Sequence, residues 1–174
     1  TGEFFENPVL LAAVRAAKER GTALHLMGLV SDGGVHSHID HLLALVDLAK
    51  NEGLPRVFIH AFLDGRDTPP KSGLGYVEAL ERSLAEKGIG RIATVSGRYF
   101  AMDRDKRWDR VKKAHEALVA GIGEEASSGA DAVRRAYERG ETDEFVAPTV
   151  VRQAGIPVGT IMDGDAVIFF NFRA

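Results

Sequence analysis

Arginine, histidine and aspartate residues recur in this sequence directly after short apolar runs. The residues placed in this way are His36, Arg66, Asp67, Arg98, Arg104 and Arg173. A guanidinium group is planar and always charged, and it donates two parallel hydrogen bonds to a carboxylate or a phosphate. Several guanidiniums gathered at one place repel one another unless an anion lies between them. If these residues converge, we expect them to bind a small molecule that bears phosphate and carboxylate groups.

A purely structural role is the alternative for each of these residues. Arg66 and Asp67 follow the turn signal Asp64-Gly65, so they could simply cap that turn and pair with each other. Most arginines form ion pairs with surface carboxylates, and we expect Arg134 to do so. Repeated placement after a strand is hard to explain in this way, and a binding site is therefore favoured.

The loop of residues 31–38 contains two histidines, His36 and His38, close to Asp32 and His41. The spacing His-x-His is one that metal ligands use, so a metal site is an open alternative here. No cysteine or glutamate-rich motif accompanies it. We therefore expect His36 to donate a hydrogen bond to a phosphate, and we predict no metal ligand in this chain.

The elements that must position these side chains alternate between strand and helix. Continuous apolar runs are typical of strands buried on both faces, and they predict strands at residues 23–30, 57–63, 91–96 and 166–172. Helical spacing of apolar residues, ended by glycines, predicts helices that begin near residues 8, 39, 73 and 108, and a shorter helix around 133–137.

This alternation predicts an α/β fold, a three-layer domain in which helices flank a mostly parallel β-sheet. The strand at residues 57–63 is expected to be central. The carboxyl ends of parallel strands share one edge, which is where ligands bind in open α/β sheets. We therefore expect the six polar residues to line a single cleft.

Two further segments are expected to lie outside the sheet. Residues 145–151 are extended but contain Pro148, which has no amide donor for a central ladder, so we expect a peripheral position. Residues 124–129 are the most linker-like part of the chain, although they are too short to divide it.

Several other residues are assigned to packing rather than to chemistry. His25 and His60 lie inside apolar strands, where we expect hydrogen-bonded core histidines. The charged residues of the segment 104–113 are expected to form a solvated helix face, apart from Arg104 itself. The aromatic residues at core spacing are Tyr76, Trp108 and Phe170.

Composition narrows the class of protein. The chain has 174 residues, enough for one domain, and 22 basic against 25 acidic residues give a net charge of −3, so no overall field attracts nucleic acid. The apolar runs are too short to span a membrane, and no secretion signal opens the sequence. The absence of cysteine excludes disulfides and thiol nucleophiles. We expect a cytoplasmic protein with no nucleic-acid or membrane partner.

Four motifs carry a family resemblance. They are LMGLVSDGGVHSH at 26–38, HAFLDGRDTPP at 60–70, SGRY at 96–99 with MDRD at 102–105, and FNFRA at 170–174, preceded by GEFFENP at 2–8. In this order they resemble the 2,3-bisphosphoglycerate-independent phosphoglycerate mutases. The resemblance covers essentially the whole chain, and four long motifs in the same order make it highly specific.

The resemblance implies an enzyme that interconverts 3-phosphoglycerate and 2-phosphoglycerate through a phosphoserine intermediate. Such an enzyme has an alkaline-phosphatase-like domain, which carries the serine nucleophile and two Mn²⁺ or similar divalent ions. A second domain, inserted into the first, holds the substrate. Residues 1–174 are similar to that insert, so we expect a single substrate-holding, or phosphotransferase, domain excised from the larger enzyme, with no cofactor of its own.

The resemblance also implies roles for individual residues. The residues implied to hold phosphoglycerate are His36, Arg66, Asp67, Arg98, Arg104 and Arg173. Asp67 is additionally implied in proton transfer as the phosphoryl group leaves and returns. The family's nucleophilic serine, its metal ligands, a lysine near the phosphoryl group and a further arginine after the Arg173 motif are not found here.

We therefore expect no mutase activity from this chain alone, and at best weak affinity for phosphoglycerate. Its expected partners are 2- and 3-phosphoglycerate and the phosphatase-like domain, and it is expected to be a monomer. Two alternatives stay open. One is a free-standing binding module for small phosphorylated acids, and the other is a metal-dependent hydrolase built on His36, His38 and Asp67.

Overall fold

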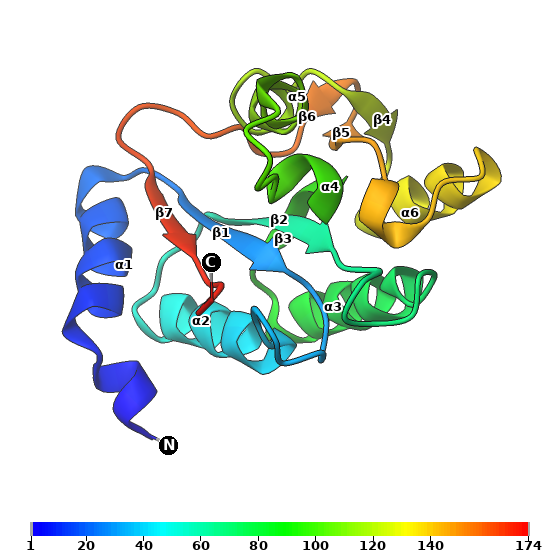
Figure 1. Ribbon diagram of the computed structural model, residues 1–174. Coiled ribbons are helices and arrows are strands. Elements are labelled where there is room, and N and C mark those ends of the chain that lie inside the picture. The colour runs from blue at the N-terminus through cyan, green and yellow to red at the C-terminus, as the bar shows by residue number, and fades with distance from the viewer. Residues whose placement is uncertain (1, 174) are drawn as a thin grey trace.

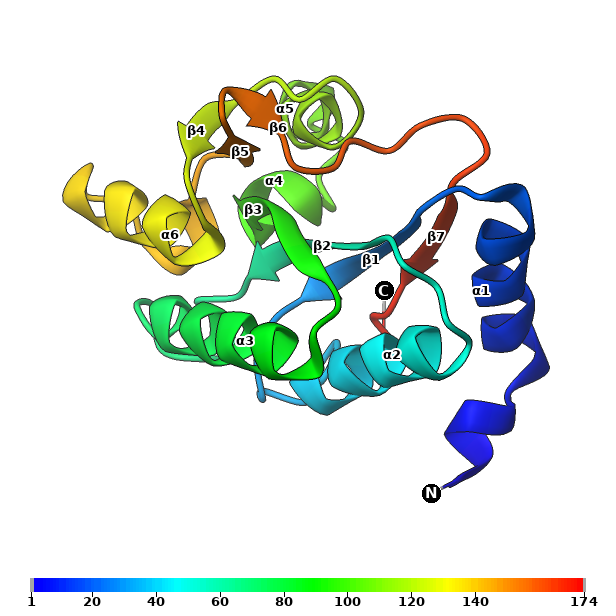
Figure 2. The same ribbon diagram turned by 180° about the vertical axis from the view of Figure 1, so that it is seen from behind.

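Seven strands form one sheet with helices on both faces in the computed structural model, which describes residues 2–173 (Figures 1 and 2). The strands are β1 (Leu24–Leu29), β2 (Val57–Leu63), β3 (Arg91–Gly97), β4 (Glu124–Ala126), β5 (Thr149–Gln153), β6 (Ile156–Pro157) and β7 (Ala166–Phe169). Their order is β4-β5-β3-β2-β1-β7, with β6 paired to β5. Most pairs are parallel, and β5 is antiparallel to β3 and β6. The predicted fold class and the central position of β2 are confirmed.

The helices divide between the two faces of the sheet. They are α1 (Pro8–Arg20), α2 (Ile39–Asn51), α3 (Gly73–Lys87), α4 (Arg98–Ala101), α5 (Trp108–Val119) and α6 (Gly129–Glu138), with short 3₁₀ turns η1 (Gly2–Glu6) and η2 (Asp143–Phe145). Figures 1 and 2 both show α2 and α3 below the strands and α4 and α5 above them. In the described part of the chain, the helices are too short or too polar for any of them to cross a membrane.

Local sequence signals explain where helix α1 begins and ends. The side-chain oxygen of Asn7 accepts hydrogen bonds from the amides of Val9 and Leu10 at 3.0 and 3.3 Å, and Pro8 occupies the first helical position. Gly21 ends the helix with φ of 67°, a left-handed conformation that glycine adopts without strain. The predicted start and stop of this helix are confirmed.

The main core lies where β1 and β2 meet the helices that follow them. Leu24, Leu26, Ile59 and Leu63 are almost fully buried in one apolar cluster. The helical members of this cluster from α2 and α3 are Leu42, Leu45, Val46, Leu48, Ala49, Val77, Leu80 and Leu84. Because helices cover both faces of β1 and β2, these strands are apolar along their length, as the sequence predicted.

Two predictions about the far side of the sheet are wrong. Strand β5 is not peripheral, because it pairs with both β3 and β4. Pro148 precedes its first residue, so the missing amide falls outside the ladder, and the proline carbonyl accepts a hydrogen bond from the Glu124 amide at 3.0 Å. The predicted linker at 124–129 contains strand β4 and the first residue of α6.

Two predictions about burial are also wrong. Trp108 is 72% exposed, because α5 buries Ala114 and Ala117 instead, on a face that does not include the first residue of the helix. Strand β7 is an edge strand with alternating burial, in which Val167 and Phe169 are 44% and 48% exposed. Phe170, beyond its end, is buried as predicted, and Tyr76 is partly buried and packs against the core.

His25 and His60 form a buried chain of hydrogen bonds across the sheet. The ring nitrogens Nδ1 of His25 and Nε2 of His60 are 2.9 Å apart, His25 Nε2 lies 2.9 Å from Asp165 Oδ2, and His60 Nδ1 lies 2.9 Å from Thr94 Oγ1. Because the Asp165 carboxylate can only accept, His25 donates to it, His60 donates to His25, and the hydroxyl of Thr94 donates to His60. Both rings are neutral in this arrangement, and the prediction of hydrogen-bonded core histidines is confirmed.

This buried chain predicts a loss of stability in mild acid. Burial lowers the pKa of His60 from 6.5 to about 3, whereas the unfolded chain takes up a proton near pH 6.5. The free energy of unfolding should therefore fall by about 2 kcal/mol between pH 7 and pH 5 from this residue. Urea unfolding of the chain at both pH values should show a smaller acid loss for His60→Gln than for the wild type. His115→Gln, at an exposed position, should keep the wild-type loss; equal slopes in all three proteins would contradict this account.

Candidate functional site

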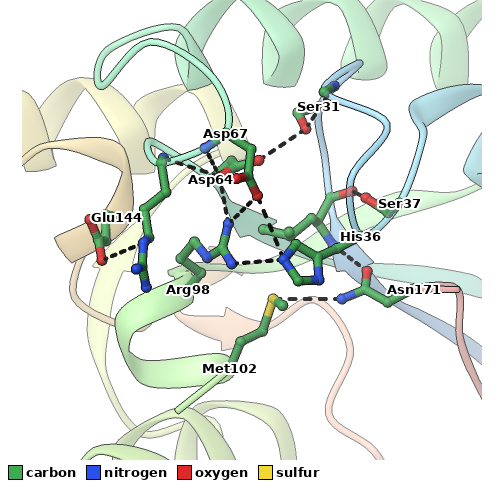
Figure 3. Close-up of polar contacts among 12 residues, drawn as sticks. Ser31, His36, Ser37, Asp64, Asp67, Arg98, Met102, Glu144 and Asn171 are labelled. Atoms are coloured by element: carbon green, nitrogen blue, oxygen red, sulfur yellow. Dashed lines mark hydrogen bonds and ion pairs between the residues drawn. The ribbon is translucent and has the colours of Figure 1, made fainter. Parts of the chain in front are cut away.

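Three strands deliver polar side chains to one edge of the sheet. The chain leaves β1 into the loop that carries His36, leaves β2 at Asp64, and leaves β3 at Arg98, which begins α4. Figure 3 shows the side chains of Asp64, Asp67, Arg98 and His36 pointing toward one another. The expected convergence of strand ends is therefore present in the structure.

A buried ion pair between Arg98 and Asp64 lies at the centre of this site. Arg98 Nη1 donates to Asp64 Oδ1 and to Asp67 Oδ2, both at 2.8 Å, and the side chains of Arg98 and Asp64 are only 7% and 3% exposed. Asp64 Oδ1 also accepts from the amides of Arg66 and Asp67 at 3.1 and 3.0 Å. One carboxylate therefore shapes the turn after β2 and fixes the guanidinium after β3.

His36 completes the cluster, and its surroundings define its protonation. Its Nδ1 lies 3.2 Å from the carbonyl of Arg173, which can only accept, so Nδ1 carries the proton. Its Nε2 lies 3.2 Å from Arg98 Nη2 and 3.4 Å from Arg104 Nη2. Because guanidinium nitrogens only donate, Nε2 is the acceptor in these two contacts, and it also lies 3.6 Å from Asp67 Oδ2. His36 thus orients two arginines in this structure.

Asp67 is held in its charged form. The hydrogen bond from Arg98 lowers the pKa of this carboxyl, and the charges of Arg98 and Arg66 act in the same direction against a smaller effect of burial. Asp67 is therefore an anion at neutral pH. It can accept a hydrogen bond from a hydroxyl group or take its proton.

A pocket of about 540 Å³ opens beside the cluster. Its lining residues are Arg66, Arg98, Tyr99, Met102, Asp103, Arg104, Asp105, Arg110, Glu144 and Phe145. The side chain of Arg66 is 61% exposed, and its Nε lies 3.7 Å from the Glu144 carboxylate. Arg104 is also an exposed residue. Of the four arginines that line the pocket, Arg98 and Arg110 are largely buried and the other two are exposed.

Arg173 approaches the site through its backbone. The amides of Phe172 and Arg173 both donate to the His36 carbonyl, at 2.8 and 3.4 Å, and the Arg173 carbonyl binds the His36 ring. Among the described residues, those that line the pocket do not include Arg173, whose side chain is exposed. The structure therefore places this predicted residue next to His36, but it does not place its guanidinium in the pocket.

The purely structural roles considered for these residues hold for some of them and not for others. Arg66 pairs with Glu144 and Asp67 with Arg98, so the two residues do not simply neutralise each other. Arg134, expected on the surface, does pair with Glu78 there. His38 caps helix α2 by accepting from the Asp40 amide at 3.2 Å. Within residues 2–173, no group of three or more His, Cys, Asp or Glu side chains is arranged to hold a metal ion.

Sequence reasoning missed several residues at this site. Arg110 was assigned to a solvated helix face, but its side chain is only 16% exposed, lies over the Tyr99 ring at 3.9 Å and binds Asp103 at 3.2 Å. The sequence identifies Asp64 only as part of a turn signal. Glu144 carried no signal at all, because it is distant in sequence from every motif. The aromatic residue directly after Arg98 was the one available hint of a guanidinium partner.

A comparison of the sequence with protein-family models shows the family of this chain. The model described as the BPG-independent PGAM N-terminus matches residues 1–174. The chain belongs to this family. The resemblance drawn from the four motifs is thereby confirmed.

Individual mutases show the same relationship. The chain is 64% identical over 173 residues to the 2,3-bisphosphoglycerate-independent phosphoglycerate mutase of Moorella thermoacetica, covering 99% of the chain and 34% of that protein. It is 62% identical to the Myxococcus xanthus enzyme of the same name, covering 100% of the chain and 34% of that protein. The chain therefore spans about a third of the length of the mutases it matches.

The fold of the chain also matches a solved mutase structure. A crystal structure of Leishmania mexicana phosphoglycerate mutase at low cobalt concentration superposes with a TM-score of 0.91 and 35% identity. The match covers 98% of this chain and 33% of that one. The fold described above thus matches the fold of about a third of a phosphoglycerate mutase.

The central ion pair predicts a large effect on stability. Arg98→Ala would leave the Asp64 carboxylate buried without its partner, which should lower the free energy of unfolding by about 3–5 kcal/mol. Arg134→Ala breaks an ion pair whose arginine is 53% exposed, and it should cost less than about 1 kcal/mol. Urea unfolding of the two variants measures the difference. Equal losses would show that the Arg98 cluster does not organise this edge of the sheet.

Proposed function

We propose that this chain is the substrate-holding domain of a 2,3-bisphosphoglycerate-independent phosphoglycerate mutase, and that it binds 2- and 3-phosphoglycerate. The observation that carries the proposal is the pocket at the strand ends, which Arg66, Arg98 and Arg104 line, while His36 beside it contacts Arg98 and Arg104. A phosphorylated three-carbon acid offers two anionic groups to such a set of guanidiniums. Membership of the mutase family supports the same substrate class.

The residues of the site would divide their roles by exposure. Arg98 is buried and paired with two carboxylates, so it would keep a fixed position and donate a hydrogen bond to the ligand from its remaining nitrogen. Arg66 and Arg104 are exposed and would turn toward the phosphate or carboxylate of the ligand. Arg173 would contribute its guanidinium by a change of side-chain orientation alone, since its backbone already binds His36. Together these contacts would fix the glycerate in one orientation.

Asp67 would act on the glycerate hydroxyl groups. Its carboxylate is anionic, because Arg98 lowers its pKa, and it lies beside the pocket arginines. It would accept a hydrogen bond from the hydroxyl that receives the phosphoryl group, and it would take the hydroxyl proton as the new oxygen–phosphorus bond forms. This proton transfer would belong to the second half of the reaction, and the proton it yields would replace the one taken up in the first half by the glycerate oxygen whose phosphoryl group moved to the serine.

The chemistry of phosphoryl transfer would require the rest of the enzyme. We place the serine nucleophile, which becomes phosphoserine, and two Mn²⁺ or similar ions in the two-thirds of the mutase outside this chain, in a cytoplasmic enzyme. Within residues 2–173, no group of three or more His, Cys, Asp or Glu side chains is arranged to hold a metal ion. The domain described here would position the glycerate while its phosphoryl group moves to and from the serine.

This division of labour predicts that the chain alone is inactive. The purified chain should show no conversion of 3-phosphoglycerate in an assay coupled to enolase, while the full-length mutase shows turnover under the same conditions. Turnover by the chain at more than a trace of the full-length rate would contradict the proposed division.

The exposed arginine predicts a change in substrate affinity. In the full-length mutase, Arg66→Ala should raise KM for 3-phosphoglycerate roughly 10- to 100-fold, because it removes charge-assisted hydrogen bonds of about 1.5–3 kcal/mol. Arg134→Ala, which removes an equally exposed arginine on α6, is the matched control and should leave KM unchanged. An unchanged KM in Arg66→Ala would remove this residue from the substrate site.

A further inference from the structure

The turn η2, far from every motif in sequence, is wedged between two of the site loops. The Asp143 amide donates to the Pro70 carbonyl at 2.9 Å, at the end of the loop after β2. The Val146 carbonyl accepts from the Gly97 amide at 2.8 Å, directly before Arg98. Residues that follow α6 therefore connect the loop of Arg66 and Asp67 to the strand end that carries Arg98.

The Asp143 side chain makes this connection rigid. The residue is fully buried, with 0% exposure. Its Oδ2 accepts from the Gly73 amide at 2.8 Å, and its Oδ1 accepts a short hydrogen bond from the Tyr137 hydroxyl. One carboxylate thus joins the start of α3 to α6, at the end of the loop that carries Arg66 and Asp67.

Glycines at the site loops allow η2 to approach this closely. A Cβ atom on Gly97 would lie 2.2 Å from the Glu144 carbonyl oxygen, and one on Gly65 would lie 2.7 Å from the Glu144 amide. A Cβ atom on Gly73 would lie 2.7 Å from Asp143 Oδ1. All three distances are shorter than real Cβ contacts, so the turn and the loops fit together without slack.

Asp143 occupies this position at an energetic cost. Burial raises the pKa of its carboxyl despite hydrogen bonds that act in the opposite direction, and the charge of Asp64 raises it further. The anion is therefore less stable here than in water. Costly polar groups of this kind are retained where a precise geometry is needed.

We propose that Asp143 is a positioning residue of the substrate site, because it clamps the far end of the loop that carries Arg66 and Asp67. The near end of the loop is held by Asp64, which accepts from the Arg66 and Asp67 amides. The far end is held by Asp143 through Pro70 and Gly73. Two aspartates thus fix the loop at both ends, and Asp143 acts on the ligand only through it.

This inference rests on the proposed function for its effect on turnover, but not for its effect on the loop. Without the Asp143 carboxylate, the Gly73 amide and the Tyr137 hydroxyl lose their acceptor, and residues 65–73 gain freedom that ligand binding must then remove. Displacement of a positioning group by about 1 Å can reduce catalysis about 100-fold. The loss should fall on KM more than on kcat, because the loop is proposed to hold the ligand.

The test uses the full-length mutase. Asp143→Ala should lower kcat/KM for 3-phosphoglycerate about 100-fold, mainly through KM, and Asp143→Asn should recover to within about 3-fold of wild type because its carbonyl still accepts from Gly73. Tyr137→Phe, which removes one donor and keeps the carboxylate, should raise KM about 3- to 5-fold even if the alanine variant folds poorly. An asparagine variant as impaired as alanine, or an unchanged KM in Tyr137→Phe, would overturn the inference.

A matched control separates positioning from general loss of stability. Glu81 on α3 accepts from the Gly129 and Ala130 amides at 2.7 and 3.3 Å, away from the substrate pocket. Glu81→Ala should therefore lower stability and leave KM unchanged. A KM increase in Glu81→Ala equal to that in Asp143→Ala would assign the effect to stability and overturn the inference.

Hydrogen exchange gives a readout that does not depend on the reaction. The amides of residues 65–73 should exchange faster in Asp143→Ala than in Glu81→Ala or wild type, and unchanged exchange would overturn the inference. If the wild-type full-length protein failed to convert 3-phosphoglycerate, the proposed function would fail, while the exchange comparison would still decide the role of Asp143.

Discussion

The buried pair of Arg98 and Asp64 is the constraint on which this edge of the molecule depends. Two charges removed from water are stable only when their geometry is good and their remaining donors and acceptors are satisfied. Asp64 meets this condition by accepting from two backbone amides as well as from the guanidinium, and Arg98 does so through Asp67 and His36. The turn after β2, the start of α4 and the loop after β1 are therefore mutually dependent.

This constraint separates the arginines of the pocket into two kinds. Arg98 and Arg110 are held by carboxylates and aromatic or imidazole rings, and they have little freedom. Arg66 and Arg104 are exposed at the rim. The buried guanidiniums attract an anion without reorganisation, whereas the exposed ones are accessible to an anion from solvent.

Much of the fold and part of the site could be predicted from the sequence. Continuous apolar runs identified β1, β2 and β3, and the residues after them met at one edge because parallel strands end on the same side. The prediction failed where tertiary contacts override local signals. Pro148 suggested a peripheral strand, yet its missing amide falls just outside the β5 ladder. Arg110 has the same local pattern as a solvated residue, and only the fold brings it to Tyr99. The wedge of η2 between two loops depends on packing that has no local signature.

The exposed position of Trp108 has a practical consequence for spectroscopy. This residue is the single tryptophan of the sequence. In sequence it lies between Arg104 and Arg110, which both line the pocket. An indole that is 72% exposed already emits in a nearly aqueous environment, so its fluorescence should change little when the chain unfolds. Circular dichroism is the better signal for unfolding. The same indole becomes a sensitive optical reporter for any surface that covers Trp108, since only such a contact would shift its emission toward shorter wavelengths.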